Sequence, residues 1–354
     1  MATLADGVPK LLVEEIRNGR CVAFVGAGFI QPSRPSWHGL LMHLVERIRD
    51  EGQKNDLRAW LGQKERQLSS RDYEAIGEAI RESLGPAFTP ALRDALNQPL
   101  KDENVSRLRM LREIPFHAIL TTNFDDSLDG ALPCGPAAYA SVLQRPTTPW
   151  WEDARWRGEE RAEVPVVKLH GSIESARDLV LTTRAYRDRV HGTAGYQSFL
   201  RALFATHTVL YMGFSFSDAY INELRSATLA LLGSETKDRP DYAILNDVPG
   251  LMARHLENHE KLVPLTFDTT PKAGNGPDRD FSGFDEWLER IYHRTNPRET
   301  LLEVLSQRRI LWLDTEPRRN DYGFEALTRR RGGHRIDQVK TVEEALERLQ
   351  VNRG

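Results

Sequence analysis

Short apolar runs recur along the first three quarters of the chain and predict the strands of one sheet. They cover Cys21–Val25, Phe116–Leu120, Pro165–Leu169, Thr208–Met212, Tyr242–Leu245 and Leu262–Phe267. Few polar residues interrupt them, and runs of this kind are typical of strands that are buried on both faces. The sequence therefore predicts a sheet that is covered on both sides.

Segments with helical spacing separate these runs. They are residues 8–18, His38–Arg49, Tyr73–Leu84, Pro90–Asn97, Gly195–Ala205, Ala219–Leu232, Gly250–Asn258 and Phe284–Arg294. Strands that alternate with helices form mostly parallel sheets, because each parallel connection needs a crossover. We therefore predict an α/β fold, a Rossmann-like parallel sheet with helices on both faces.

Two segments stand outside this alternation. Residues 50–112 are rich in charge and hold no convincing strand, which predicts a helical insertion in a domain that spans residues 1–300. A small β-α-β-α appendage is expected over 307–354, with strands at Arg309–Asp314 and Ile336–Val339, a helix over 321–330, and a last helix opened by a capping box at Thr341. It resembles the first third of a receiver domain but is too short for that fold, which favours a packing or oligomerisation role.

Composition and charge set the broad class. The chain is 40% hydrophobic and 28% charged, as in a soluble globular protein, and its net charge of −3 gives no overall attraction to nucleic acid. Two cysteines, Cys21 and Cys134, are too few for a disulfide framework or a four-cysteine zinc site. The N-terminal segment is not typical of a signal peptide, and no run is long enough to span a membrane, so we expect a cytoplasmic protein without membrane contact.

Polar residues follow the second predicted strand, in the order Thr121-Thr122-Asn123-Phe124-Asp125. In open α/β sheets ligands bind at the carboxyl ends of the strands, where Asn123 and Asp125 can hold a sugar hydroxyl, an amide or a water. The alternative is that Asn123 and Asp125 cap a following helix, since both residue types favour that position.

Three other strands also end in residues suited to chemistry. Gly26-Ala27-Gly28 either approaches a pyrophosphate or forms only a tight turn. His170, followed by Gly171, is either a general base or a structural residue. After the fourth strand come Gly213, Ser215 and Asp218; Ser215 can donate to a phosphate, and Asp218 either binds a ribose hydroxyl or caps the helix over 219–232. A weaker candidate is Asn246-Asp247 after the fifth strand.

The order of these motifs resembles the sirtuin-like (Sir2-like) family, specifically its branch in bacterial anti-phage defence, over roughly residues 10–295. The resemblance implies that Gly26, Ala27 and Gly28 cradle the pyrophosphate of NAD. Asn123 would position the nicotinamide ribose or an attacking water, and Asp125, with Thr122 beside it, would contact the nicotinamide end. His170 would be the general base, and Gly213, Ser215 and Asp218 would complete the binding site.

Two departures from the family pattern matter. Sirtuins carry a hydroxyl residue soon after Gly-Ala-Gly, whereas Phe29 and Ile30 stand here, with Ser33 or Ser36 as possible substitutes. Deacylating sirtuins also carry a four-cysteine zinc module, whose place between about 125 and 165 is taken by a segment with Trp150, Trp151 and Trp156. We therefore expect no zinc and disfavour protein deacylation.

The resemblance implies an NAD+ glycohydrolase effector that releases nicotinamide and ADP-ribose and stops a phage by depleting NAD. A homo-oligomer is expected, and the activator is left open between a phage trigger and a partner ATPase such as a HerA-type DNA translocase. Two alternatives stay open: a non-catalytic module that binds NAD or ADP-ribose, and a nuclease subunit that works with a partner ATPase.

Overall fold

The computed structural model describes most of the chain. The described residues are 7–62, 68–128, 164–173, 179–192, 195–216, 218–232, 239–270, 279–296, 310–313 and 336–351. They fall into two compact units, Met1–Tyr292 and His293–Gly354.

The first unit is built on a six-stranded sheet. Its strands are β1 (Cys21–Val25), β2 (Ala118–Thr121), β3 (Val166–Lys168), β4 (Thr208–Met212), β5 (Asp241–Asn246) and β6 (Leu262–Phe267). They lie in the order β3-β2-β1-β4-β5-β6, and every pairing is parallel. This order is that of the Rossmann fold, so the predicted fold class is confirmed.

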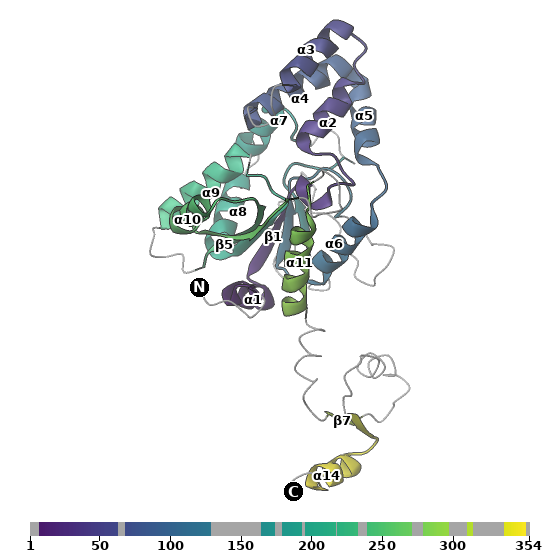
Figure 1. Cartoon of the computed structure of the whole chain (residues 1–354), viewed down its shortest axis with the longest axis vertical. Helices are drawn as coiled ribbons and strands as arrows, with labels where there is room; N and C mark the ends of the chain where they lie inside the picture. Colours follow the sequence, from purple (N-terminus) through teal and green to yellow (C-terminus); the bar gives the residue numbers. More distant parts are fainter. Residues whose placement is uncertain are drawn as a thin grey trace. The chain divides into compact units, whose positions relative to one another are not determined.

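Successive strand residues pack on opposite faces of the sheet. On one face Cys21, Ala23 and Val25 contact α1 (Lys10–Arg17), α6 (Asp102–Glu113) and α11 (Ser282–Thr295). On the other face Val22 and Phe24 contact α8 (Tyr196–Thr206) and α9 (Ala219–Leu232). Both faces of β1 are fully buried, which is why its sequence is an unbroken apolar run. Figure 1 shows α8, α9 and α10 (Gly250–His259) on the opposite side of the sheet from α6 and α11.

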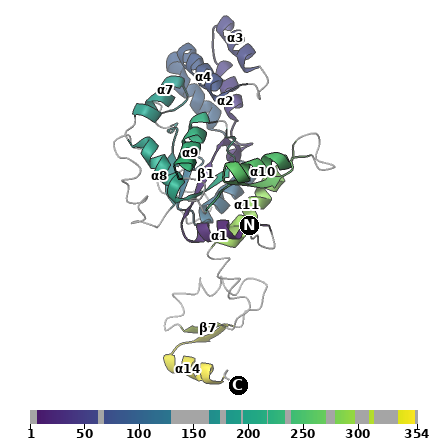
Figure 2. The same ribbon diagram turned by 90° about the vertical axis from the view of Figure 1, so that its left-hand side faces the viewer.

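Helices fill the chain between β1 and β2. They are α2 (Trp37–Val45), α3 (Glu51–Leu61), α4 (Ser70–Leu84), α5 (Phe88–Leu96) and α6. The first four enclose a core of their own, into which Phe124 and Leu181 reach from the sheet domain. Figures 1 and 2 both show α2, α3 and α4 gathered with α7 (Thr183–Arg187) at one end of the sheet. This helical layer therefore covers the strand ends that carry the polar motifs.

The strand order reverses between β1 and β4, and their loops meet there. The Gly26 amide donates to the Met212 carbonyl at 3.0 Å, and the Gly28 amide donates to the Gly213 carbonyl at 2.9 Å. Val25 lies level with both Thr121 and Met212, and Thr121 lies level with Lys168. Because the four strands end at the same height, the motifs that follow them share one edge. Ligands bind at such a switch point in doubly wound folds.

Element bounds differ from the predicted ones where tertiary contacts decide them. The helix expected to reach Arg49 ends at Val45, and a new helix begins at Glu51 after Asp50, whose carboxylate accepts the Gln53 amide. The predicted helix is therefore four residues too long at its end, and the helix that Asp50 caps lies beyond the predicted bounds. Residues 145–163, which contain the three tryptophans, lie outside the described residues, as does Cys134.

The second unit contains a two-stranded sheet. Strand β7 (Ile310–Leu313) pairs in parallel with β8 (Ile336–Val339), and α14 (Val342–Val351) follows. The Glu344 amide donates to the Thr341 hydroxyl, which is one half of the expected capping box. The helix predicted over 321–330 lies outside the described residues. Among the helices that the structure describes, none is long and apolar enough to cross a membrane.

Candidate active site

A cavity of about 1360 Å³ lies along the carboxyl edge of the sheet. Its wall combines the loops after β1, β2, β3 and β4 with residues of the helical layer. The main site residues that the sequence put forward line it: Gly26, Ala27, Gly28, Thr122, Asn123, Asp125, His170, Gly213, Ser215 and Asp218. Of the weaker candidate pair, Asn246 also lines the cavity, whereas Asp247 is not among the lining residues. The fold thus brings together four motifs that are far apart in the chain.

The glycines at the floor of the cavity allow two loops to touch. A Cβ on Gly26 would lie 2.5 Å from the Gly213 carbonyl oxygen, and one on Gly28 would lie 2.9 Å from the same atom. Gly213 has a φ of 62°, a left-handed conformation that favours glycine. The close packing of the β1 and β4 loops therefore explains why glycine occupies these three positions. Because glycine has no side chain, the backbone at these positions also lines the cavity directly.

Thr121 fixes the start of the loop that follows β2. Its hydroxyl donates to the Val25 carbonyl at 2.7 Å and accepts the Asn123 amide at 3.0 Å. The Asn123 side chain then donates to the Gly26 carbonyl at 3.3 Å and is 7% exposed. The carboxamide is thus held against the β1 loop at the edge of the cavity.

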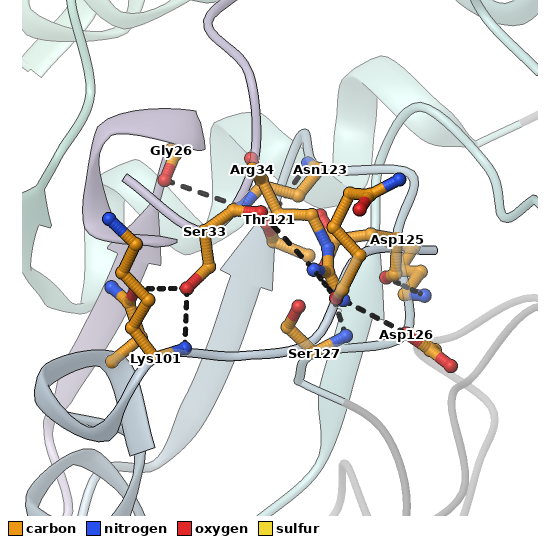
Figure 3. A network of polar contacts seen from close by, with 12 residues as sticks. Gly26, Ser33, Arg34, Lys101, Thr121, Asn123, Asp125, Asp126 and Ser127 are labelled. Atoms are coloured by element: carbon orange, nitrogen blue, oxygen red, sulfur yellow. Dashed lines mark hydrogen bonds and ion pairs between the residues drawn. The ribbon is translucent and has the colours of Figure 1, made fainter. Parts of the chain in front are cut away.

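Asp125 is enclosed by two basic residues. Its carboxylate accepts the Ser127 amide at 2.9 Å and lies 3.9 Å from Arg34 Nε, while its carbonyl accepts a 2.6 Å bond from Lys168 Nζ. Arg34 also lies 3.9 Å from Asp126 and donates to the Gln98 carbonyl. Figure 3 shows the Arg34 side chain between the β1 loop and the loop of Asp125. The described residues from Asp125 to Leu128 form a bend and a turn, and the residues after Leu128 lie outside the described part of the chain, so the helix cap stays a prediction.

The two serines that follow Gly-Ala-Gly have different surroundings. Ser33 is buried, donates to Asn104 Oδ1 at 2.5 Å and accepts the Lys101 amide at 2.7 Å (Figure 3). Ser36 lines the cavity and caps α2, where its hydroxyl accepts the Gly39 amide at 3.1 Å. Phe29 and Ile30 are fully buried. Of the two substitutes considered for the family hydroxyl, only Ser36 reaches the cavity.

His170 faces Asp218 across the cavity wall. Its Nε2 lies 3.2 Å from Asp218 Oδ2, and both side chains are about nine-tenths buried. Asp218 Oδ1 accepts the Ile221 amide at 3.0 Å, so this residue also caps α9. Burial opposes the ionisation of Asp218, but the His170 contact and the Ile221 amide outweigh it and hold its pKa below the usual value.

The helical layer contributes to the same pocket. Tyr186 of α7 meets the His170 ring edge-on, with centroids 5.3 Å apart, and its hydroxyl approaches Asp218. Glu74 of α4 lines the cavity, and burial together with the Asp218 charge raises its pKa. Trp37 of α2 packs on Phe124 with centroids 5.7 Å apart. The segment between β1 and β2 is therefore part of the site.

Sequence reasoning did not identify Arg34, Lys168, Tyr186 or Glu74. Lys168 carried a usable signal, because it is a lysine inside an apolar strand, and its burial requires a partner. Arg34, Tyr186 and Glu74 carried none, since each lies in a segment without a motif and reaches the cavity only through tertiary packing. Among the described residues, no group of three or more His, Cys, Asp or Glu side chains is placed to hold a metal ion.

Comparison with known proteins gives the class of this domain. Residues 117–265 match the family model of the SIR2-like domain, a span that runs from β2 to β6 and includes Asn123, His170 and Asp218. The resemblance to sirtuin-like proteins is therefore confirmed over these residues. The Gly-Ala-Gly motif after β1 lies before the matched span.

Three relatives extend the match. The chain is 28% identical over 221 residues to Defense-associated sirtuin 2 of Bacillus subtilis, covering 61% of this chain and 20% of that protein. It is 24% identical over 250 residues to NAD(+) hydrolase ThsA of Enterococcus faecium, covering 68% of this chain and 46% of that protein. Protein y4cA of Sinorhizobium fredii is 25% identical over 289 residues, covering 77% of this chain and 21% of that protein. The match thus spans less than half the length of each relative.

Proposed function

We propose that this protein hydrolyses NAD+ to nicotinamide and ADP-ribose. The observation that carries the proposal is the convergence of Gly26, Asn123, His170 and Ser215 on one cavity at the switch point of a Rossmann sheet. A SIR2-like domain and a relative named as an NAD(+) hydrolase support the same reaction. The cavity exceeds the usual range of about 300–1,000 Å³ for small-molecule sites, so a dinucleotide has room to bind.

The wall offers separate surroundings for the two ends of a dinucleotide. The bare backbone at Gly26, Gly28 and Gly213 suits a pyrophosphate, since glycine allows close approach. Asn123 and Asp125 follow β2, and His170 follows the neighbouring strand β3, with its ring centroid 6.4 Å from that of Phe124 in the β2 loop. We assign the nicotinamide ribose to the space between Asn123 and His170, with Thr122 and Asp125 toward the nicotinamide, and the phosphates to Gly213 and Ser215.

The reaction breaks the bond between C1′ of the ribose and the nicotinamide nitrogen, and the electron pair leaves with nicotinamide. The transition state resembles an oxocarbenium ion, as in glycoside hydrolysis. A water oxygen bonds to C1′ while His170 accepts its proton, and Asn123 holds the ribose or the water in line. Burial of both side chains keeps bulk water away from the reacting carbon.

We further propose that the protein is a defence effector whose activity is restrained until a trigger acts. The relative named Defense-associated sirtuin 2 supports this role. The helices between β1 and β2 and the unit after residue 307 are candidates for restraint or for contacts between copies. A molar mass measured in solution, before and after removal of residues 307–354, tests the second of these roles.

The test of the activity is a direct assay on the full chain. NAD+, nicotinamide and ADP-ribose are followed by mass spectrometry with and without candidate activators, for wild type and for Asn123→Ala. We expect stoichiometric nicotinamide and ADP-ribose from wild type, and retained folding without turnover in the variant. Equal rates for the two proteins contradict the proposal, and tight NAD+ binding without product under any condition favours the alternative of a binding module.

A further inference from the structure

The contact between His170 and Asp218 joins the proposed general base to a carboxylate that the proposed reaction does not yet use. The sequence offered two roles for Asp218, a ribose contact or a helix cap. The structure shows the cap, made by Oδ1, and places the second oxygen 3.2 Å from His170 Nε2. One carboxylate thus joins the start of α9 to the proposed general base.

We infer that Asp218 is a positioning residue that orients His170 and stabilises its protonated form during the proposed NAD+ hydrolysis. The inference rests on the proposed function for its kinetic consequences and on geometry alone for its structural ones. A carboxylate at Nε2 keeps the proton on that nitrogen, so that the other ring nitrogen is free to accept one from water. When it does, the imidazolium forms beside a negative charge.

The way in which Asp218 is held supports a fixed orientation. Its carboxylate is about nine-tenths buried, and the Ile221 amide anchors Oδ1. Asn222 of the same first turn donates to the Phe216 carbonyl and secures the loop that precedes α9. A carboxylate with one oxygen anchored and the other facing a histidine has little freedom to rotate.

Other groups also face the imidazole. Tyr186 of α7 packs edge-on against the ring, and the Phe124 ring lies with its centroid 6.4 Å away. Glu74 of α4 is within electrostatic range of both His170 and Asp218, with Arg71 on the same helix offsetting its charge. Among these groups, Asp218 is the carboxylate in direct contact with the ring.

Asp218→Asn separates the charge of Asp218 from its capping role. Asparagine also caps helices, so this variant keeps the Ile221 contact and removes only the charge. We expect kcat to fall about 10²-fold or more with little change in KM, since an amide at this position favours the wrong tautomer. Asp218→Ser, which also caps, should behave alike, and Asp188→Asn, an exposed aspartate, should match wild type.

A second measurement separates this inference from the proposed function. Nitrogen-15 NMR of the full chain without nucleotide reports which ring nitrogen of His170 carries the proton, assigned from the signal lost in His170→Gln. Asp218→Asn should move that proton from Nε2 to Nδ1 whether or not NAD+ is cleaved. A raised KM with unchanged kcat overturns the inference in favour of a ribose contact, and an unchanged tautomer overturns it in favour of a purely structural cap.

Discussion

On the β1–β2 side of the cavity, the side chains of Arg34, Asn123 and Asp125, and of Thr121 beneath them, are held by hydrogen bonds to backbone atoms. On the β3–β4 side, formed by His170, Tyr186 and Asp218, the His170 ring faces the Asp218 carboxylate and packs against the rings of Phe124 and Tyr186. The first side is built for fixed geometry, and the second holds a group that can gain and lose a proton. This difference teaches that one cavity can separate substrate positioning from proton transfer.

The largest expected effect is a loss of kcat on changing His170, on the proton-transfer (β3–β4) side of the cavity. We expect His170→Ala to lower kcat for NAD+ hydrolysis by about 10²–10⁴-fold, the usual contribution of a general base. NAD+ binding, measured by calorimetry, should change little, because the β1–β2 side is intact. His255→Ala on the exposed face of α10 is the matched control and should keep wild-type kcat. Wild-type kcat in His170→Ala contradicts the role of this side.

The next largest effect is a loss of stability on changing Arg34, on the positioning (β1–β2) side of the cavity. Arg34 is 6% exposed and faces the buried Asp125, so Arg34→Ala leaves a buried carboxylate without its counter-charge. We expect the free energy of unfolding in urea to fall by about 3 kcal/mol. Arg47→Ala removes an exposed arginine that pairs with Asp94 and should cost less than about 1 kcal/mol. An equal loss of stability in the two variants shows that the Arg34 side chain does not hold the loop of Asp125.

A smaller loss should follow from the change at Thr121. Thr121→Val keeps the shape of the side chain but leaves the Val25 carbonyl and the Asn123 amide without their shared hydroxyl partner. The expected cost is about 1–3 kcal/mol in the free energy of unfolding. Thr206→Val, at an exposed position of α8, should stay within about 0.5 kcal/mol of wild type. A neutral Thr121→Val shows that the loop is held by other contacts.

The smallest effect refines the proton-transfer side. Tyr186→Phe keeps the ring against His170 and removes only the hydroxyl that approaches Asp218. We expect kcat to fall about two- to tenfold, which corresponds to the loss of one hydrogen bond. Tyr292→Phe, which loses a bond to Glu113 on the surface, serves as the control and should retain kcat. A larger fall than in Asp218→Asn reverses the proposed order of the two residues.

The strands and the shared edge were predictable because they depend on local pattern. Residues Cys21–Val25, Thr208–Met212 and Leu262–Phe267 form strands with the predicted bounds, since each is an apolar run closed by polar or small residues. The parallel sheet then places the ends of those runs together whatever the details of the connections. The parallel order of the strands is therefore enough to predict that Asn123, His170 and Ser215 lie near one another.

The contacts that distinguish the two sides were not predictable. Arg34 meets Asp125 only because the segment after β1 folds back across the loop that follows β2. Strands β3 and β4 are separated in the sheet by β2 and β1. Asp218 meets His170 because the loops that follow β3 and β4 both reach the same cavity. No sequence period encodes distances between loops, so Asp218 was understood from the chain only as a cap or a ribose contact.

The central claim is that the two sides of the cavity flank the bond that breaks in NAD+. A crystal structure of His170→Ala with NAD+ tests it most directly, since this variant keeps the β1–β2 side and should not consume the ligand. We expect the nicotinamide ribose between Asn123 and position 170, with the pyrophosphate over Gly26 and Gly213. A nucleotide bound in the reverse direction, with its adenine at position 170, or bound outside this cavity contradicts it.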